Sequence, residues 1–151
     1  MIRRLHRRHC IAAGLAWGAW GFSGGALAAK KAAPAKVLVL GDSLSAEYGL
    51  PRGTGWVALL EQRLAQEKIA ASVVNASVSG ETTSGGRSRL PALLREHQPS
   101  VVVIELGGND ALRGFSLAHT EDNLTQMVQA AQQAGAKVLL VGMQAPPTYG
   151  R

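Results

Sequence analysis

The sequence predicts an α/β fold, namely a three-layer α/β/α sandwich with a parallel sheet, flavodoxin-like in character. Two observations support this. Apolar segments rich in β-branched residues, such as 101–106 (VVVIEL), show no polar alternation, which is typical of strands buried on both faces of a sheet. Segments with helical apolar periodicity separate them, and this alternation indicates parallel strands joined by crossover helices.

The expected strands are short and begin after the first 36 residues. The first, 37–40 (VLVL), ends at Gly41-Asp42, a combination that commonly closes a buried strand. The clearest is the 101–106 segment, which runs into Gly107-Gly108. The remaining two are expected at 71–75 (ASVVN) and 137–141.

Three helices are expected between these strands, at 56–68, 88–97 and 120–134. Each has apolar residues at the spacing of one helical face. Thr54 or Gly55 can cap the first, and Pro99 follows the second. Thr120 is the expected N-cap of the third, and Gly135 its C-terminal stop.

The first 28 residues are expected to be a secretory signal peptide. A basic start (Arg3, Arg4, Arg7, Arg8) precedes an uncharged apolar stretch over 11–28. The stretch ends in the small-x-small pattern Ala26-Leu27-Ala28, so cleavage is expected after Ala28, with a periplasmic or secreted product. The alternative is an uncleaved membrane anchor, which the shortness of the apolar stretch disfavours. Residues 29–36 are then a linker, and 37–151 form one domain.

The high pI of the chain comes largely from this leader. Of the 16 Lys and Arg residues, four lie in the first 28, which leaves 12 against 10 Asp and Glu, a net charge of +2. Such a balance gives no support for nucleic-acid binding. The only cysteine, Cys10, also lies in the leader, so residues 29–151 contain neither a thiol nucleophile nor a disulfide.

Chemically versatile residues follow three of the strands. Ser43 comes just after the first strand, Gly80 lies in the loop after the second, and Asn109 lies in the loop after the third. In parallel sheets the carboxyl ends of the strands form one edge, where sites are built. Ser43 offers a hydroxyl nucleophile, Gly80 a closely approachable backbone N–H, and Asn109 a neutral amide donor. Singly, each loop is also explained as an ordinary turn or cap.

Taken together, the loops resemble the SGNH, or GDSL-type, hydrolase family, and within it the group of periplasmic acyl-CoA thioesterases, lysophospholipases and arylesterases. The resemblance spans about residues 36–151. It rests on these segments: VLGDSLSA (39–46), VVNASVSG (73–80), RLPALL (89–94), ELGGND (105–110) and LRGF (112–115).

The resemblance implies a function and a site. The activity would be cofactor-free hydrolysis of acyl esters or thioesters by a monomer acting on a small-molecule substrate. Ser43 would be the nucleophile, and the N–H of Ser43, the N–H of Gly80 and the Asn109 amide would bind the oxyanion. Asp42 and Asp110 would support the serine and asparagine loops. Residues 111–115 would form a mobile loop over the acyl pocket, with Ala145 and Pro146 in its wall.

One element of the family pattern does not occur in these 151 residues. The family takes its base and carboxylate from a C-terminal D-x-x-H motif, and no D-x-x-H is present. His6 and His9 lie in the leader, His97 near the end of a helix and His119 before one, so none is expected to be the base. The SGNH fold is therefore expected to be C-terminally truncated here.

Two other functional classes stay open. The first is a catalytically incompetent fragment, or a weak binder of acyl chains or glycans. The second is a flavodoxin-like ligand binder, which is disfavoured because neither G-x-G-x-x-G nor a P-loop occurs. No His, Cys and carboxylate cluster predicts a metal site. An uncovered sheet edge would make residues 29–151 poorly soluble alone.

Overall fold

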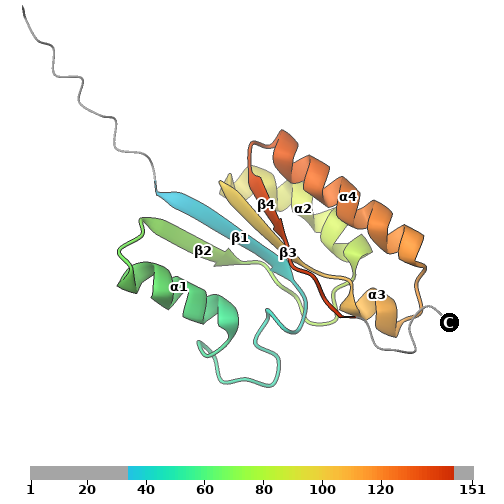
Figure 1. Cartoon of the computed structure of the whole chain (residues 1–151), viewed down its shortest axis with the longest axis horizontal. Helices are drawn as coiled ribbons and strands as arrows, with labels where there is room; N and C mark the ends of the chain where they lie inside the picture. The colour runs from blue at the N-terminus through green and yellow to red at the C-terminus, as the bar shows by residue number, and fades with distance from the viewer. Residues whose placement is uncertain (1–33, 145–151) are drawn as a thin grey trace, which may run out of the picture. The chain divides into compact units, whose positions relative to one another are not determined.

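The computed structural model describes residues 34–144, and its architecture is the predicted one, a parallel sheet with helices on both faces (Figure 1). Within these residues, four strands form a single sheet in the order β2-β1-β3-β4. The strands are β1 (Ala35–Gly41), β2 (Ala71–Asn75), β3 (Val101–Glu105) and β4 (Lys137–Leu140). The helices are α1 (Trp56–Gln66), α2 (Thr83–His97), α3 (Gly108–Leu112) and α4 (Leu117–Gln133).

Every strand pair in the sheet is parallel. Val39 of β1 lies opposite Asn75 of β2 on one side and Val103 of β3 on the other, and Val102 of β3 lies opposite Val138 of β4. Because all four strands point the same way, their carboxyl ends share one edge. The loops after β1, β2 and β3 leave the sheet from that edge, as the sequence predicts.

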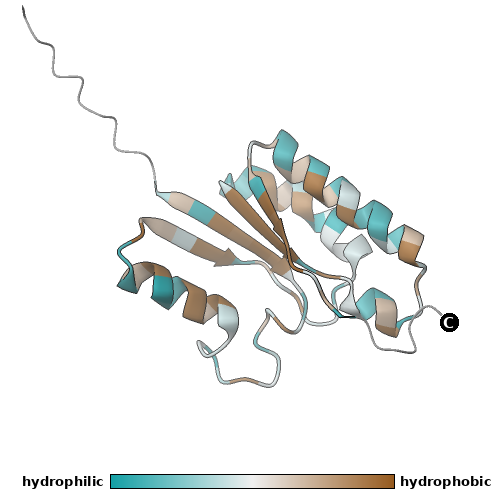
Figure 2. Ribbon diagram, viewed as in Figure 1, coloured by the Kyte–Doolittle hydropathy of each residue, from teal (hydrophilic) through white to brown (hydrophobic). Residues whose placement is uncertain are grey.

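The helices divide the sheet into two unequal faces. Helices α2 and α4 pack on each other and on one face, and α1 lies on the opposite face (Figure 1). Alternation along β1 sends Leu38 and Leu40 to the first face and Val39 to the second. The central strands are mostly apolar, whereas the helices carry hydrophilic and hydrophobic residues in alternation along their length (Figure 2).

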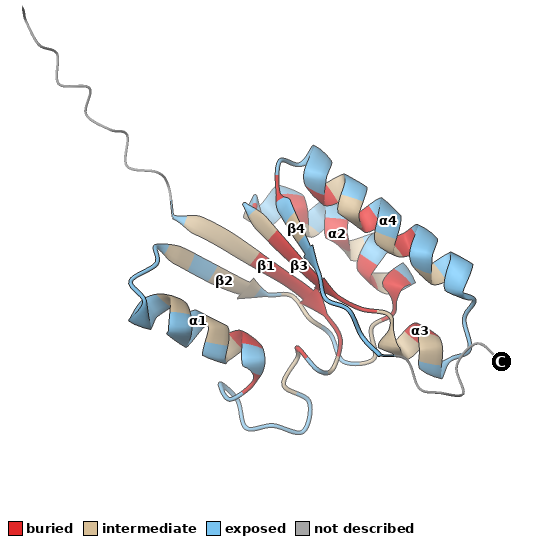
Figure 3. Cartoon of the chain, viewed as in Figure 1, coloured by how far each residue is buried: buried red, intermediate tan, exposed pale blue. Residues whose placement is uncertain are grey.

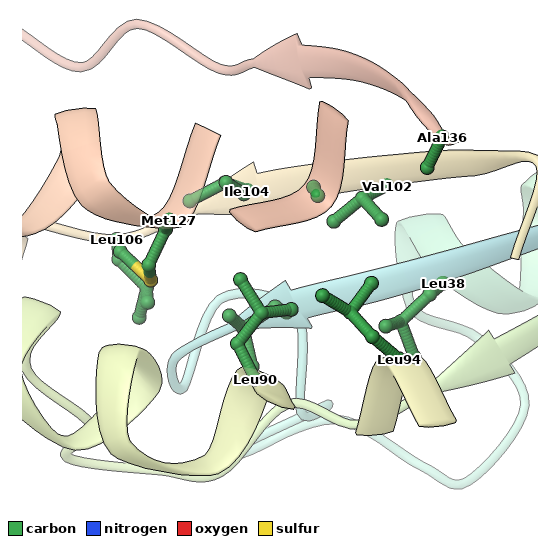
Figure 4. Close-up of a cluster of buried hydrophobic side chains, with 10 residues drawn as sticks. Leu38, Leu90, Leu94, Val102, Ile104, Leu106, Met127 and Ala136 are labelled. Atoms are coloured by element: carbon green, nitrogen blue, oxygen red, sulfur yellow. The ribbon is translucent and has the colours of Figure 1, made fainter. Parts of the chain in front are cut away.

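The face covered by α2 and α4 holds the main core. Its members are almost inaccessible to water, and they come from β1, α2, β3, α4 and the loops next to them (Figures 3 and 4). The cluster comprises Leu38, Leu40, Leu90, Leu94, Val102, Ile104, Leu106, Met127, Ala131 and Ala136. On the α1 face only Val39, Val57 and Val103 form a buried cluster among the described residues.

Helix α2 begins five residues before the predicted start at residue 88. Thr82 caps it, with its hydroxyl accepting the Gly85 N–H at 3.3 Å. Two consecutive glycines in the first turns hide this start in the sequence, because glycine disfavours helices. The structure explains one of them: a Cβ on Gly86 would lie 2.4 Å from Leu106 Cδ1, so the helix approaches the sheet too closely for a side chain.

The region before and within α4 also differs from the prediction. The helix begins at Leu117 and Ser116 is its N-cap, accepting the His119 N–H at 3.2 Å, so Thr120 is not the cap. The short helix α3 was not predicted, and it includes part of the segment 111–115 that was expected to be a loop. Ala35 pairs with Ala71, so the end of the predicted linker 29–36 belongs to β1.

Two sets of expectations fall outside the described residues. They are the signal peptide at 1–28 and the pocket residues Ala145 and Pro146. Between residues 34 and 144, none of the helices combines the length and apolar character that a bilayer-spanning helix requires.

Candidate active site

Ser43 lies in a tight turn that follows β1 directly. The backbone N–H groups of Ser45 and Ala46 both donate to the Asp42 carbonyl, at 3.2 and 2.9 Å. The Asp42 carboxylate also accepts the Leu44 N–H at 3.0 Å, so it closes the turn from within. This arrangement holds Ser43 half-buried at the carboxyl edge of the sheet. Among the described residues, neither its N–H nor its hydroxyl has a hydrogen-bond partner.

Gly80 lies in a β-turn that follows β2. The Glu81 N–H donates to the Val78 carbonyl at 3.1 Å, and Gly80 has φ +79° at the third position of the turn. A positive φ there is typical of a type II turn and favours glycine. This segment, residues 76–82, is called the glycine loop, and the turn 42–46 is called the serine loop. The two loops are joined because the Val78 N–H donates to the Gly41 carbonyl, just before the serine loop, at 3.0 Å. Within residues 34–144 the Gly80 N–H is unpartnered.

Asn109 joins the other two loops. It lies at the start of α3, and its side-chain nitrogen donates to the Asp42 carboxylate at 3.1 Å and to the Glu81 carbonyl at 2.9 Å. Asp42 precedes Ser43 and Glu81 follows Gly80 in the chain. One carboxamide therefore holds together the serine loop and the glycine loop, so the structure places Ser43, Gly80 and Asn109 in one small region.

Asp110 is a buried anchor for the asparagine loop. Its side chain is fully buried, and it accepts hydrogen bonds from the Thr83 N–H at 2.9 Å and from the Thr83 hydroxyl. The Thr120 hydroxyl lies 3.5 Å from Asp110 Oδ1. Asn123 of α4 extends the network by donating to the Thr83 hydroxyl at 3.1 Å. These contacts tie α3 to the first turn of α2 and to α4.

A second buried carboxyl, Glu105, lies at the end of β3 beneath the serine loop. Its Oε2 accepts a hydrogen bond from the Ser45 hydroxyl at 2.8 Å. The Trp56 indole N–H donates to the same hydroxyl at 3.0 Å. Burial raises the pKa of the Glu105 carboxyl, the nearby Asp42 charge adds to that effect, and the Ser45 hydrogen bond opposes it.

Two arginines hold the glycine loop. Arg89 of α2 donates to the Glu81 carboxylate at 2.7 Å and to the Ala76 carbonyl at 2.9 Å, and so clamps both ends of the loop. Arg113, just after α3, donates to the Gly80 carbonyl at 2.9 Å. Together with Asn109, these side chains engage three carbonyls of the loop. The carbonyl groups are thereby fixed by donors from α2, from α3 and from the residue that follows α3.

Two apolar cavities lie beside these loops. One, of about 230 Å³, is bounded by α3, the start of α4 and the end of β4, with Gly108, Ala111 and Leu124 in its wall. The other, of about 370 Å³, is bounded by Leu44, Trp56, Glu105 and residues 141–143. Met143 lines both. Both cavities are lined mainly by apolar atoms.

Neither of the two described histidines forms a hydrogen bond with Ser43 or its turn. His97 is the last residue of α2, whose first turn lies at the carboxyl edge of the sheet, so the histidine is at the other end of the helix. His119 lies in the first turn of α4, and its Nε2 is 3.1 Å from the Asn123 amide nitrogen. Within residues 34–144, no group of His, Cys, Asp or Glu is arranged to hold a metal ion.

Several supporting residues were not predicted from the sequence. They are Ser45, Trp56, Thr83, Glu105, Arg89 and Arg113. Only Glu105 has a clear signal in the sequence, because it is a charged residue at the end of an apolar strand. The others are ordinary polar or aromatic residues whose roles depend on contacts between distant segments.

Comparison with known proteins adds independent information. The GDSL-like Lipase/Acylhydrolase family matches residues 39–151 of this chain. Esterase TesA of Pseudomonas aeruginosa is 56% identical over 124 residues, which are 82% of this chain and 62% of that protein. Thioesterase 1/protease 1/lysophospholipase L1 of Escherichia coli K12 is 49% identical over 122 residues, 81% of this chain and 57% of that protein. The chain thus spans about three fifths of the length of these relatives.

Solved structures agree with the sequence matches. The crystal structure of TesA has a TM-score of 0.74 and 58% identity, and it covers 76% of this chain and 64% of that one. The psychrotrophic esterase EstA from Pseudoalteromonas sp., in a crystal structure inhibited by monoethylphosphonate, has a TM-score of 0.73 and 46% identity. Coverage there is 76% of this chain and 63% of that one.

Proposed function

Because the chain belongs to the GDSL-like lipase/acylhydrolase family, we propose that it carries the nucleophile and the oxyanion-binding loops of a serine hydrolase that cleaves esters or thioesters. The observation that carries the proposal is the position of Asn109. Its carboxamide contacts the residue before Ser43 and the residue after Gly80. These two contacts support an arrangement in which Ser43 N–H, Gly80 N–H and the Asn109 amide bind the carbonyl oxygen that Ser43 Oγ makes negative by attacking its carbon.

In the proposed reaction, Ser43 Oγ attacks the acyl carbonyl and forms a tetrahedral intermediate. The carbonyl oxygen becomes negative and accepts hydrogen bonds from Ser43 N–H, Gly80 N–H and the Asn109 amide. The C–O or C–S bond then breaks, the alcohol or thiol leaves with a proton, and water hydrolyses the acyl-enzyme. The two backbone N–H groups are unpartnered among the described residues, so both are available to the oxyanion.

The Asn109 amide nitrogen has two hydrogens, and both are already engaged. The bond to the Glu81 carbonyl (2.9 Å) is shorter than the bond to the Asp42 carboxylate (3.1 Å). We propose that the Glu81 bond orients the amide and that the oxyanion shares the hydrogen now directed at Asp42. Asp42 then has two tasks, to close the serine turn and to hold the amide ready for the substrate.

A base must take the proton of Ser43, because a serine hydroxyl is a weak nucleophile at neutral pH. Neither His97 nor His119 contacts the serine loop in the described residues. No D-x-x-H motif occurs in the 151 residues. The proposal therefore does not assign the base.

The substrates we propose are esters or thioesters with an apolar acyl group. The names of the relatives include esterase, thioesterase and lysophospholipase. The apolar cavity of about 230 Å³ beside Asn109 would take the acyl chain. Ala145 and Pro146 remain proposed members of its wall. We also propose an exported, periplasmic or secreted enzyme on the basis of residues 1–28.

The test is the hydrolysis of p-nitrophenyl esters by the full gene product that carries this chain. We expect Ser43→Ala to lower kcat by about 10³- to 10⁶-fold, as loss of a serine nucleophile does elsewhere. Asn109→Ala should lower kcat by about 10²- to 10³-fold with little change in KM, because the amide acts mainly on the transition state.

Ser79→Ala is the matched control. Ser79 is exposed and precedes Gly80, so its loss should leave kcat unchanged. Unchanged hydrolysis by Ser43→Ala would refute the assignment. A gene product without esterase activity whose Ser43 also resists phosphonates would instead favour a catalytically incompetent remnant.

A further inference from the structure

Glu105 is a buried carboxyl whose presence the proposed chemistry does not explain. It ends the apolar strand β3 and is only 5% exposed. Of its two oxygens, Oε2 accepts the Ser45 hydroxyl, while Oε1 is buried and has no hydrogen-bond partner among the described residues. Burying a half-satisfied carboxyl costs free energy, and an apolar residue would avoid that cost. The presence of a carboxyl at this buried position therefore needs a structural or functional explanation.

The reason lies in what Glu105 holds. Ser45 is 1% exposed, and each of its polar groups is engaged. Its hydroxyl donates to Glu105 and accepts the Trp56 indole N–H, and its backbone N–H donates to the Asp42 carbonyl. Its carbonyl accepts the Asn75 amide at 2.8 Å. Ser45, two residues after Ser43, is thus the point at which the turn is fastened to the sheet and to α1.

The space between the end of β1, Ser45 and Glu105 is tightly filled. A Cβ on Gly41 would lie 2.6 Å from Ser45 Oγ and 3.0 Å from Glu105 Oε2. Gly41 also lies directly opposite Glu105 in the β1–β3 register. The carboxyl, the hydroxyl and the end of β1 therefore pack against one another beneath the turn. A shift of Ser45 would move the backbone that carries Ser43.

We propose that Glu105 is a positioning residue for the nucleophile: by accepting the Ser45 hydroxyl, which Trp56 holds from the other side, it sets where the turn presents Ser43. This inference rests on the proposed role of Ser43. The clamp needs an acceptor oxygen and not a negative charge. A neutral carboxyl, or an amide of the same shape, supplies that acceptor equally well.

The experiment compares three variants of the full gene product in p-nitrophenyl ester hydrolysis, with kcat and KM measured separately. Glu105→Gln keeps the acceptor oxygen and the side-chain size. Glu105→Leu keeps the approximate volume but removes the acceptor. Ser45→Ala removes the hydroxyl and leaves Glu105 in place. Glu61→Gln, at an exposed position of α1, is the control, and thermal melts identify the temperature at which all variants are folded.

We expect Glu105→Leu and Ser45→Ala each to lower kcat by about 10- to 100-fold with KM within about twofold, because a small misplacement of a reacting group slows the chemical step. Glu105→Gln should stay within about threefold of the original enzyme. Combining Ser45→Ala with Glu105→Leu should cost no more than either change alone, since both break one clamp. A purely structural role would lower stability without this division between kcat and KM or this rescue by Gln.

Two outcomes would overturn the proposal. One is a folded Glu105→Leu or Ser45→Ala enzyme with kcat within threefold of the original; Ser45→Ala decides the matter where Glu105→Leu does not fold. The other is a Glu105→Gln variant as impaired as Glu105→Leu, which would show that the charge matters. Ser43→Ala is measured alongside, and activity that survives it refutes the proposed function itself, whatever the Glu105 variants do.

Discussion

The two faces of the sheet are built very differently. On the face covered by α2 and α4, a large cluster of side chains is excluded from water. On the α1 face only Val39, Val57 and Val103 form a buried cluster among the described residues. Leu139 of the edge strand β4, in register with Val103, is 56% exposed. Among residues 34–144, buried apolar packing is therefore more extensive on the α2–α4 face than on the α1 face.

The loops of the candidate site are held by contacts on both faces of the sheet, and each loop is anchored by residues of the face on which it lies. Asn109 and Asp110 are fixed to the well-packed face through Thr83 at the start of α2. The Ser43 turn lies over the thinner face and is fixed through Glu105, Ser45 and Trp56 of α1. Both loops are fastened by buried hydrogen bonds, the proposed nucleophile loop to α1 beside a small apolar cluster and the proposed oxyanion loop to α2 and α4 beside the main core.

The largest difference between the faces is expected for two adjacent valines of β3. Val102 is fully buried on the α2–α4 face, and Val103 is 5% exposed on the α1 face. Val102→Ala should lower the free energy of unfolding by about 2–3 kcal/mol, and Val103→Ala by about 1 kcal/mol, because thinner surroundings collapse more readily around a cavity. Urea unfolding followed by circular dichroism measures both. Equal losses would show that the faces are equally well packed.

The anchor of the asparagine loop gives the next largest effect. Thr83→Val removes the hydroxyl that bonds Asp110 and accepts from Asn123. Leaving those buried groups unpaired should lower the free energy of unfolding by about 1–3 kcal/mol, and it should also lower kcat through Asn109. Thr120→Val is the control, since its hydroxyl lies 3.5 Å from Asp110. An equal effect of the two changes would contradict the assigned anchor.

Two carboxyls on the α1 side, Glu105 and Glu47, are expected to respond to pH in opposite ways. The pKa of Glu105 is raised in the folded protein, so the stabilisation linked to its proton is complete below the unfolded pKa and is lost as pH rises through the folded one. Glu105→Gln should remove that loss, so its stability relative to the original protein should increase over this pH range. The gain in the free energy of unfolding is about 1.4 kcal/mol for each unit by which the folded and unfolded pKa values of Glu105 differ.

Glu47 provides an internal contrast for the same titration. The N–H groups of Gly53 and Gly55 donate to its carboxylate and lower its pKa. Its contribution is therefore present above the unfolded pKa and is lost as pH falls through the folded one. Glu47→Gln should change stability in the opposite sense to Glu105→Gln. Parallel pH profiles of the two variants would refute this account of Glu105.

The smallest effect is expected for Arg113. Its guanidinium is exposed and donates to the Gly80 carbonyl at 2.9 Å. Arg113→Met should change stability by less than about 1 kcal/mol, and it should lower kcat only a few-fold by loosening the glycine loop. Arg63→Met is the control, because among residues 34–144 the side chain of that arginine pairs only with the exposed Glu67, the C-cap of α1. Full activity in the Arg113 variant would show that Asn109 and Arg89 hold the loop without it.

Local patterns were enough to predict the strands and the order of the loops. The parallel sheet and the strand 71–75 follow from apolar runs, and Ser43, Gly80 and Asn109 follow from strand ends. The start of α2 was wrong because Gly85 and Gly86 weaken helix propensity, while close packing on Leu106 requires a glycine. The clamp of Glu105, Ser45 and Trp56 joins three separate segments, and no local pattern contains that information.

The central claim, that three donors meet at one oxygen, is tested most directly by a crystal structure of the protein after reaction with an alkyl phosphonate. We predict a covalent bond from phosphorus to Ser43 Oγ. One phosphoryl oxygen should lie about 2.7–3.1 Å from Ser43 N, Gly80 N and Asn109 Nδ2. An adduct on another residue, or a phosphoryl oxygen that neither Gly80 nor Asn109 contacts, would contradict the claim.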